Sequence, residues 1–175
     1  MAKLRKFVGY RTIERPYTRK SRFRALNFVR ASPPTKVVKF DLGDTKRKFE
    51  YELSLISDCD LQIRDNSLEA ARKMANRHLE KNFGRLGYHL QVSKYPHHFL
   101  RENATASGAG ADRLSTGMKM SFGKVIGRAA QVRKGETIFR VHVDQAQVEL
   151  SRKILGRIST KMPRGAKVVV KKITA

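Results

Sequence analysis

The chain contains stretches in which apolar and polar residues alternate, and stretches in which apolar residues recur every three or four positions. Strict alternation is typical of a strand with one buried face. It predicts half-buried strands over residues 49–56 and 88–94. Further strands are predicted over residues 36–42, 97–101, 128–133, 137–143 and 167–173. Lys134 and Gly135 separate two of these stretches, and they predict a hairpin turn between them.

Two stretches carry the helical period instead. The first predicts a helix over residues 65–83 that stops at Gly84, with Asn66 and Glu69 as a capping box. Its expected buried face consists of Leu68, Ala71, Ala75, Leu79 and Phe83. The second predicts a helix that begins after Asp144 and buries Ala146, Leu150, Ile154 and Ile158. Residues 112–122 are ambiguous, although Leu114, Met118 and Phe122 follow a helical spacing.

The order of these elements indicates an α+β fold, because the helices follow runs of strands and do not alternate with single strands. We expect a sandwich of mixed or antiparallel strands with two main helices, which forms one domain over residues 36–175. Residues 1–35 are expected to be a basic extension. Pro33 and Pro34 close it, since paired prolines interrupt regular structure.

The stretch 97–128 opens with a predicted strand and then loses both periods. It contains five glycines, and the run from Asn103 to Ala111 has almost no side chain large enough to bury. Ordering such a segment is not compensated by hydrophobic burial. Long loops of this kind are usually functional or disordered. We predict a glycine-rich functional loop over residues 102–112 that a partner orders, and that is mobile in the free protein.

The net charge indicates what kind of partner this is. The chain has 38 Lys and Arg against 15 Asp and Glu, a formal net charge of +23, and its pI is about 10.8. A charge of this size calls for a polyanion. A membrane surface is the weaker candidate, because no apolar run approaches ~18 residues and no signal peptide is evident. Cys59 is the only cysteine, which argues against disulfides and fits a reducing, intracellular compartment.

The extension combines cations with aromatic residues, and its only acid is Glu14. The aromatic residues interleaved with its lysines and arginines are Phe7, Tyr10, Tyr17, Phe23 and Phe28. Alternating arginines and aromatics suit phosphate contacts combined with stacking on exposed bases. We therefore predict an arm that folds on RNA; the alternative is a disordered, solvated arm.

Cations also punctuate the glycine-rich stretch. Small side chains allow backbone amides to approach phosphates, while Arg and Lys supply the opposite charge. The residues predicted to contact RNA are Arg19, Lys20, Arg22, Arg24, Arg30, Arg101, Arg113, Lys119, Lys124 and Arg128. The polar face of the first predicted helix is either solvated or a further RNA contact, and it carries Arg72, Lys73, Arg77 and Lys81.

The cations are not accompanied by a pattern that indicates catalysis or metal binding. The glycine spacing of the loop departs from that of a phosphate-binding loop, and Val125 stands where magnesium requires a hydroxyl. His97 and His98 are neighbours on a predicted strand, so they point to opposite faces and do not readily share a metal. Glu102 and Asp112 fit the anchoring of the loop ends better than acid–base chemistry. We predict no catalytic residue, no metal and no cofactor.

A family resemblance is carried mainly by the residues after Tyr95. The segments that carry it are 96–103, 108–113, 116–119 and 122–124, with 68–72, 75–76 and 83–84 in the first predicted helix. They resemble the L16/L10e family of large-subunit ribosomal proteins, and the resemblance covers the chain from about Tyr17 to Ile173. Val125 stands where the family pattern has a proline. The chain ends soon after its last predicted strand, which resembles archaeal more than eukaryotic members.

The resemblance implies an α/β-hammerhead-like α+β fold and a cytoplasmic location in the large ribosomal subunit. It implies a non-catalytic role in contact with large-subunit (23S-type) rRNA and neighbouring ribosomal proteins, close to the 5S rRNA region. The glycine-rich loop would then face the elongation-side (A-site) tRNA near the peptidyl-transferase centre. The residues that this assigns to the tRNA-facing loop are Glu102, Asn103, Ser107, Gly108, Gly110 and Asp112.

Two other functions are compatible with a basic chain. An RNA-modifying enzyme would need a pocket that holds a titratable group of perturbed pKa. A non-specific nucleic-acid-binding protein would bind duplex DNA as well as structured RNA, whereas a protein of rRNA should prefer folded RNA with accessible loops.

Overall fold

In the computed structural model of the chain, the structure describes residues 13–18, 21–26, 29, 31–106, 108–114, 122–163 and 165–173. The strands are β1 (Asp41–Gly43), β2 (Tyr51–Ser57), β3 (Leu61–Arg64), β4 (His89–Val92), β5 (His98–Glu102), β6 (Lys124–Val132), β7 (Thr137–Val143) and β8 (Ala166–Lys172). The helices are α1 (Asp65–Phe83), α2 (Ala111–Leu114) and α3 (Val148–Ser159), with short 3-10 helices at Arg24–Leu26 and Gln145–Gln147. The α+β class is therefore confirmed.

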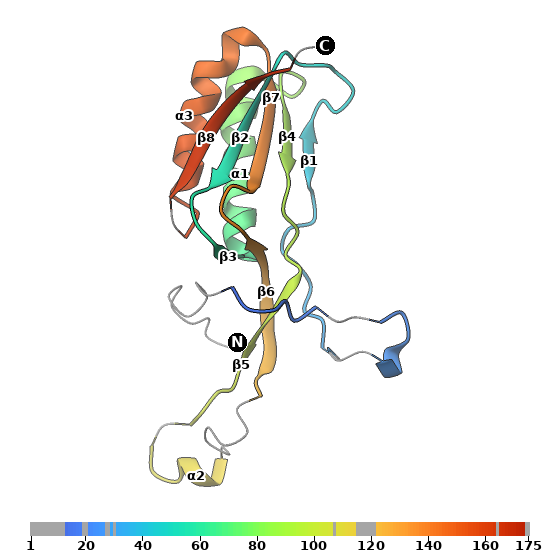
Figure 1. The fold of residues 1–175 in the computed structure, drawn as a ribbon, viewed down its shortest axis with the longest axis vertical. Coiled ribbons are helices and arrows are strands. Elements are labelled where there is room, and N and C mark those ends of the chain that lie inside the picture. The colour runs from blue at the N-terminus through green and yellow to red at the C-terminus, as the bar shows by residue number, and fades with distance from the viewer. Residues whose placement is uncertain are drawn as a thin grey trace.

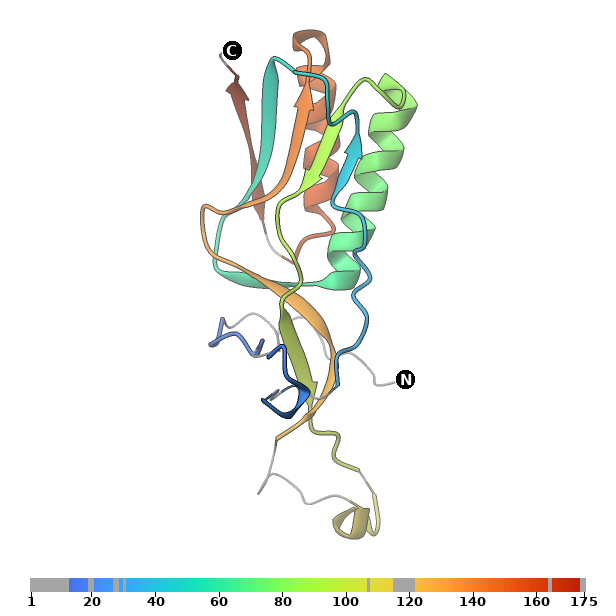
Figure 2. The ribbon, with the colours of Figure 1, turned by 90° about the vertical axis from the view of Figure 1, so that its right-hand side faces the viewer.

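The strands form two antiparallel sheets. The larger has five strands in the order β1-β4-β7-β2-β8, and α1 and α3 cover one of its faces (Figure 1, Figure 2). The smaller sheet has the order β3-β6-β5. From it, β5 and β6 run away from the two-layer body as a stalk, and the loop that carries α2 lies at the far end (Figure 1). We call β5 and β6 the stalk from here on.

The main core lies between the five-stranded sheet and the two long helices. Leu53 and Leu55 of β2 are fully buried, as are Phe139 and Val141 of the neighbouring β7. The helices contribute side chains that include Leu68, Ala71, Ala75, Leu79, Leu155 and Ile158. Full burial of one such aliphatic side chain is worth roughly 1.5–3 kcal/mol, so this layer is the main source of hydrophobic stability.

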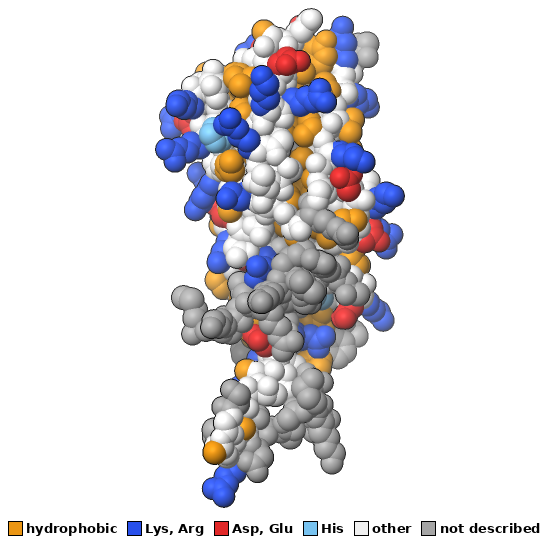
Figure 3. All heavy atoms as spheres, turned by 90° about the vertical axis from the view of Figure 1, so that its left-hand side faces the viewer, with side chains coloured by type: hydrophobic (Ala, Val, Ile, Leu, Met, Phe, Trp, Pro, Cys, Tyr) orange, Lys and Arg blue, Asp and Glu red, His pale blue; other side chains and the backbone are white. Residues whose placement is uncertain are grey.

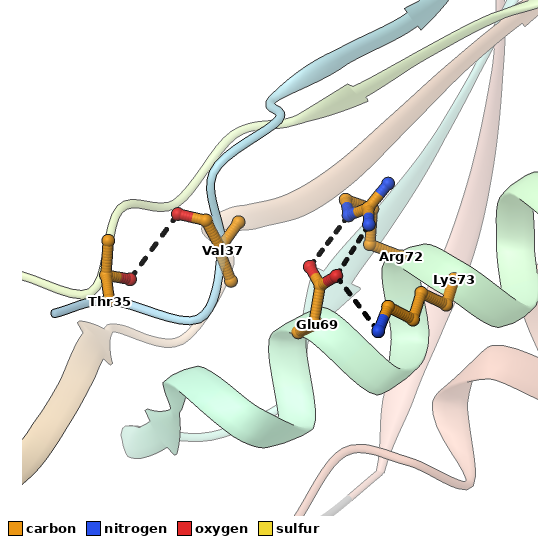
Figure 4. Close-up of polar contacts among 5 residues, drawn as sticks. All are labelled: Thr35, Val37, Glu69, Arg72 and Lys73. Carbon is orange, nitrogen blue, oxygen red and sulfur yellow. Dashed lines mark hydrogen bonds and ion pairs between the residues drawn. The ribbon is translucent and has the colours of Figure 1, made fainter.

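Helix α1 has the predicted bounds. Of the five side chains expected on its buried face, the leucines and alanines are buried and Phe83 is only partly buried. The predicted capping box is wrong. The helix begins at Asp65, whose carboxylate accepts hydrogen bonds from the backbone N–H groups of Lys36 (3.3 Å) and Asn66 (2.8 Å). Glu69 instead receives a bidentate hydrogen bond from Arg72, at 2.8 and 2.6 Å (Figure 4). Asp65 therefore replaces Asn66 as the anchor of the helix start.

The second helix begins later than its sequence pattern indicated. One turn of 3-10 helix at Gln145–Gln147 precedes α3 and changes the rotational phase of the residues that follow. As a result Ala146 and Leu150 are exposed, and Ser151 and Leu155 take the buried positions beside Ile154 and Ile158.

The predicted hairpin between β6 and β7 is wrong as a pairing. The turn itself is present, since Glu136 N–H donates to the Arg133 carbonyl (3.1 Å) and Gly135 adopts a φ of +83°. However, β6 pairs with β3 and β5, whereas β7 pairs with β2 and β4. The turn therefore passes the chain from one sheet to the other.

Three further elements differ from their expected extent. Strand β1 covers only the last residues of the stretch expected to be a strand, and before it Thr35 donates a hydrogen bond to the Val37 carbonyl (3.4 Å; Figure 4). Strand β3 was not predicted. The ambiguous stretch 112–122 contains only the short α2 within the described residues, and Phe122 follows as an exposed side chain outside any helix.

Candidate nucleic-acid interface

Part of the basic extension is fixed to the stalk. Residues 13–18 run beside β5, where Tyr17 N–H donates to His98 Nδ1 (2.9 Å) and Phe99 N–H donates to the Tyr17 carbonyl (3.2 Å). On the other strand, the Gln131 side chain donates to the Glu14 carbonyl (3.0 Å). These contacts join segments that are far apart in the sequence, and they give this part of the extension a defined path across the stalk (Figure 1).

His98 is neutral in this arrangement. Its Nδ1 accepts the Tyr17 N–H, so any ring proton must sit on Nε2. Burial lowers the pKa of His98, and His97 and Arg101 lower it further, while Glu14 opposes them. The buried imidazole is therefore a structural acceptor that holds the extension rather than a metal ligand.

Arg101 forms the centre of an aromatic cluster at the base of the glycine-rich loop. Its guanidinium carbon lies 4.4 Å from the ring centroid of Tyr17 and 4.5 Å from that of Phe122. The two rings meet edge to face, with centroids 6.0 Å apart. Such cation–π contacts are worth about 0.5–1 kcal/mol each at exposed sites. We call this set of three side chains the Tyr17–Arg101–Phe122 clamp.

Arg128 has a similar holding role on β6. Its guanidinium lies 4.9 Å from the Phe99 ring centroid and donates to Tyr95 Oη (2.9 Å) and Ser32 Oγ (2.7 Å). The side chain is half-buried. It therefore ties the end of the extension to the stalk, and its predicted contact with RNA remains a prediction.

The glycine-rich loop has a tightly constrained base. A Cβ placed on Gly123 would lie 2.5 Å from the backbone carbon of Glu102 and 2.7 Å from the backbone nitrogen of Asn103. Only glycine allows the two sides of the loop to approach so closely. The base therefore depends on one residue without a side chain.

At the far end, the loop exposes its backbone. Residues 104–106 and 108–110 are exposed, and Gly108 and Gly110 adopt positive φ values of 131° and 79°. Ala111 N–H donates to the Gly108 carbonyl (3.2 Å), and Arg113 N–H donates to the Gly110 carbonyl (3.1 Å), which starts α2. Glu102 and Asn103, at the loop's base, are half-buried.

The structure brings only some of the predicted RNA-contacting residues together. Arg101, Lys124 and Arg128 lie on the stalk and Arg113 lies in α2; all but Arg128 are exposed. Arg22 is exposed beside the 3-10 helix that contains Arg24, on a separate excursion of the chain. For Arg24 and Asp112, the structure describes only the backbone. The predicted residues that lie outside the described ranges are Arg19, Lys20, Arg30, Ser107 and Lys119.

Sequence reasoning missed the residues that hold these cations in place. Tyr17 was expected to stack on bases, and Phe122 was placed on a helical face, yet both contact Arg101. Ser32 and Tyr95 had no assigned role and both bond Arg128. The only local signal was the interleaving of aromatic residues with arginines, which does not reveal which ring meets which cation.

A groove of about 420 Å³ lies where the extension crosses the stalk, and residues lining it include Ile13, Arg15, Pro16, His97, Arg133 and Glu136. Glu136 already binds Lys94 at 2.8 Å, and this contact, with a hydrogen bond from the Arg133 backbone, lowers the pKa of its carboxyl. Glu136 thus has the opposite of the raised pKa that a general acid would need. Within the described ranges, no cluster of three His, Cys, Asp or Glu residues could hold a metal ion.

No helix in the described part of the chain is long and apolar enough to cross a membrane.

Comparison with known proteins gives the class of this fold. Residues 13–169 match the family model described as ribosomal protein L16p/L10e. The large ribosomal subunit protein uL16 of Methanococcus maripaludis strain C7 is 44% identical over 164 residues, which is 93% of this chain and 91% of the relative. The uL16 proteins of Methanococcus aeolicus and Archaeoglobus fulgidus are 44% and 42% identical, over 97% and 93% of this chain and 95% and 90% of theirs.

These matches define the class as structural proteins of the large ribosomal subunit, and not enzymes. More narrowly, the chain belongs to the ribosomal protein L16p/L10e family. The resemblance seen in the sequence is thereby confirmed.

Proposed function

We propose that the stalk and the loop 102–112 insert into large-subunit rRNA and help to shape the A-site tRNA region near the peptidyl-transferase centre, beside the 5S rRNA region. The observation that supports this most directly is the stalk itself. It places exposed cations on both sides of a loop rich in exposed small residues, away from the hydrophobic body (Figure 1). RNA phosphates are the ligands that such cations and amides attract.

The Tyr17–Arg101–Phe122 clamp gives the glycine-rich loop 102–112 a fixed base. The rings of Tyr17 and Phe122 fix the position of the Arg101 guanidinium, and among the described residues Arg101 forms no ion pair. Lys124 pairs in register with Glu102 across the same base. The guanidinium of Arg101 is thus held in place before RNA is bound, which lowers the entropy lost on binding.

The test is salt-dependent release of the protein from purified large subunits. Wild-type protein should co-sediment with the subunit and remain bound in moderate salt. The variant Arg113→Gln/Lys124→Gln should be released at lower salt, because each lost phosphate contact reduces the slope of log K against log salt by about 0.7–0.9. The control is Lys46→Gln/Lys48→Gln in the exposed loop between β1 and β2, which should behave as wild type.

A-site tRNA binding to the same subunits tests the finer part of the proposal. The Arg113→Gln/Lys124→Gln subunits should bind A-site tRNA more weakly than the control subunits at salt concentrations at which both proteins are fully bound. Equal tRNA binding would limit the role of the loop to rRNA. Recovery of the wild-type protein as a free species in low salt would contradict the proposal as a whole.

A further inference from the structure

Helix α3 has an outer face that the fold leaves uncovered. It carries the exposed cations Arg152, Lys153 and Arg157, and Lys161 follows just beyond its end. Lys153 and Arg157 are four residues apart within the helix, so they lie in one row, roughly 6 Å apart along the axis. The only acid of the helix is Glu149, in its first turn. Figure 3 shows the flank on which α3 and β8 lie, over which Lys and Arg side chains are spread.

These cations are not neutralised by the protein. Among the described residues, Arg152, Lys153, Arg157 and Lys161 form no ion pair. The corresponding face of α1 differs, because Glu69 binds Arg72 at 2.6 Å and Lys73 at 3.7 Å (Figure 4). Farther along α1, Arg77 and Lys81 form no ion pair among the described residues either. The two helices therefore differ in their acids, because α1 contains Asp65, Glu69 and Glu80 whereas α3 contains only Glu149.

Gly156 is a second feature of this face that the fold does not explain. It lies in the interior of α3 with no positive φ, and a Cβ there would meet no atom within 4 Å. Glycine in a helix interior costs about 0.5–1 kcal/mol relative to alanine. Packing within the protein therefore provides no reason for its presence. Gly156 is exposed, so the missing side chain leaves the backbone of α3 open to the approach of another backbone at this point.

We propose that the outer face of α3, centred on Gly156, is a second RNA-binding surface that holds the sugar–phosphate backbone of large-subunit rRNA. This inference rests on the proposed function and names a contact remote from the stalk. An acidic protein partner fits less well, since protein interfaces need buried apolar or aromatic anchors. The only exposed large apolar residue of α3 is Leu150, at 39% exposure.

The first test compares two matched pairs of neutralised cations in assembled subunits. Lys153→Gln/Arg157→Gln on α3 and Lys73→Gln/Arg77→Gln on α1 each remove a lysine and an arginine four residues apart. The α3 pair should be released from the subunit at clearly lower salt than wild type, with the slope against log salt reduced by about 1–2. The α1 pair should release close to wild type.

Equal effects of the two pairs, or a larger effect of the α1 pair, would overturn the inference while leaving the proposed function intact. Failure of the wild-type protein to sediment with the subunit would instead remove the proposed function itself. The two failures are therefore distinguishable in one experiment.

The second test uses Gly156→Ala. We expect the free protein to unfold at higher urea concentration, because alanine favours the helix, while the subunit releases the variant at lower salt than wild type. A variant that is stabilised in the free protein but released like wild type would overturn the role of Gly156.

Lysine acylation identifies the partner. Lys153 should be protected in the subunit and become reactive after ribonuclease digestion, whereas protection that survives digestion, or no protection, would overturn an RNA partner.

Discussion

At the scale of single residues, several cations of this protein organise the protein itself. Arg101 and Arg128 were predicted from their charge to contact RNA, and the structure places both against aromatic rings of the same chain. A guanidinium can do this and still offer N–H groups at its edge, because stacking uses its faces. The same residues can therefore hold the stalk together and present charge.

Arg101→Ala should loosen the extension without unfolding the body. Loss of two cation–π contacts, each worth about 0.5–1 kcal/mol, should speed amide exchange of Phe99 by roughly five- to thirty-fold, because that amide bonds the Tyr17 carbonyl. The measurement is hydrogen exchange by NMR in the free protein. Lys124→Ala, a nearby exposed change on β6, should leave this amide unchanged, and equal effects would argue against the clamp.

The buried His98 makes stability depend on pH. Its pKa is lowered from 6.5 by burial, so below about pH 6.5 the unfolded chain binds a proton that the folded chain does not. Stability should be greatest above this pH and fall as pH decreases toward 5. Burial also lowers the pKa of His142, which acts with the same sign.

Urea unfolding between pH 5 and 8 measures this dependence. The side-chain oxygen of the variant His98→Asn can accept the Tyr17 N–H, so this variant should keep the contact and lose part of the pH dependence of the unfolding free energy. The double variant with His142→Gln should lose the remaining pH dependence. An unchanged curve in the double variant would show that other groups carry the pH dependence.

At the scale of elements, the stalk relies on a close approach between its two sides. Gly123→Ala places a Cβ 2.5 Å from the backbone of Glu102, so the stalk must open locally. We expect destabilisation of about 1–3 kcal/mol, as for other overpacked sites, with faster exchange of the amides that pair β5 with β6. Gly127→Ala on the same strand is the control, since its Cβ would meet nothing within 4 Å.

Elements with a strong local signal could be predicted from the sequence. Helix α1 has a long 3.6-residue period and a glycine stop, and its bounds agree with the prediction. At its end, Gly84 adopts a φ of +73°, and its N–H donates to the Glu80 carbonyl (3.0 Å). Strand β3 was missed although Leu61 to Arg64 alternate apolar and polar residues, because the strand has only four residues and α1 begins directly after it.

The pairing of strands and the contacts of the candidate interface could not be predicted, because their partners are distant in the sequence. A local turn at Gly135 is the same whether the strands on either side pair with each other or with others. In the same way, nothing near Arg101 or Arg128 indicates that Tyr17 and Ser32 will reach them. The positive charge of the interface could be predicted from the sequence, whereas the contacts that position Arg101 and Arg128 depend on tertiary packing.

At the scale of the whole molecule, the net charge of +23 should oppose folding of the free protein. Raising NaCl from about 50 to 300 mM screens this repulsion, since the Debye length falls well below 10 Å by the upper end. We expect the urea midpoint of the free protein to rise over this range, while the same salt weakens its hold on RNA. A midpoint that falls with salt would show that attractive ion pairs dominate instead.

The order of strands in the larger sheet has a consequence for how the chain is made. Strand β2 is hydrogen-bonded on one side to β7 and on the other to β8, and these strands follow it by about half of the chain or more. During synthesis, Leu53 must therefore leave the exit tunnel long before its partners Val141 and Val170 exist. Sheets closed by such distant partners form slowly, and their unpaired strands can aggregate in the meantime. We therefore expect the nascent chain to benefit from a chaperone that binds β2 until translation is complete.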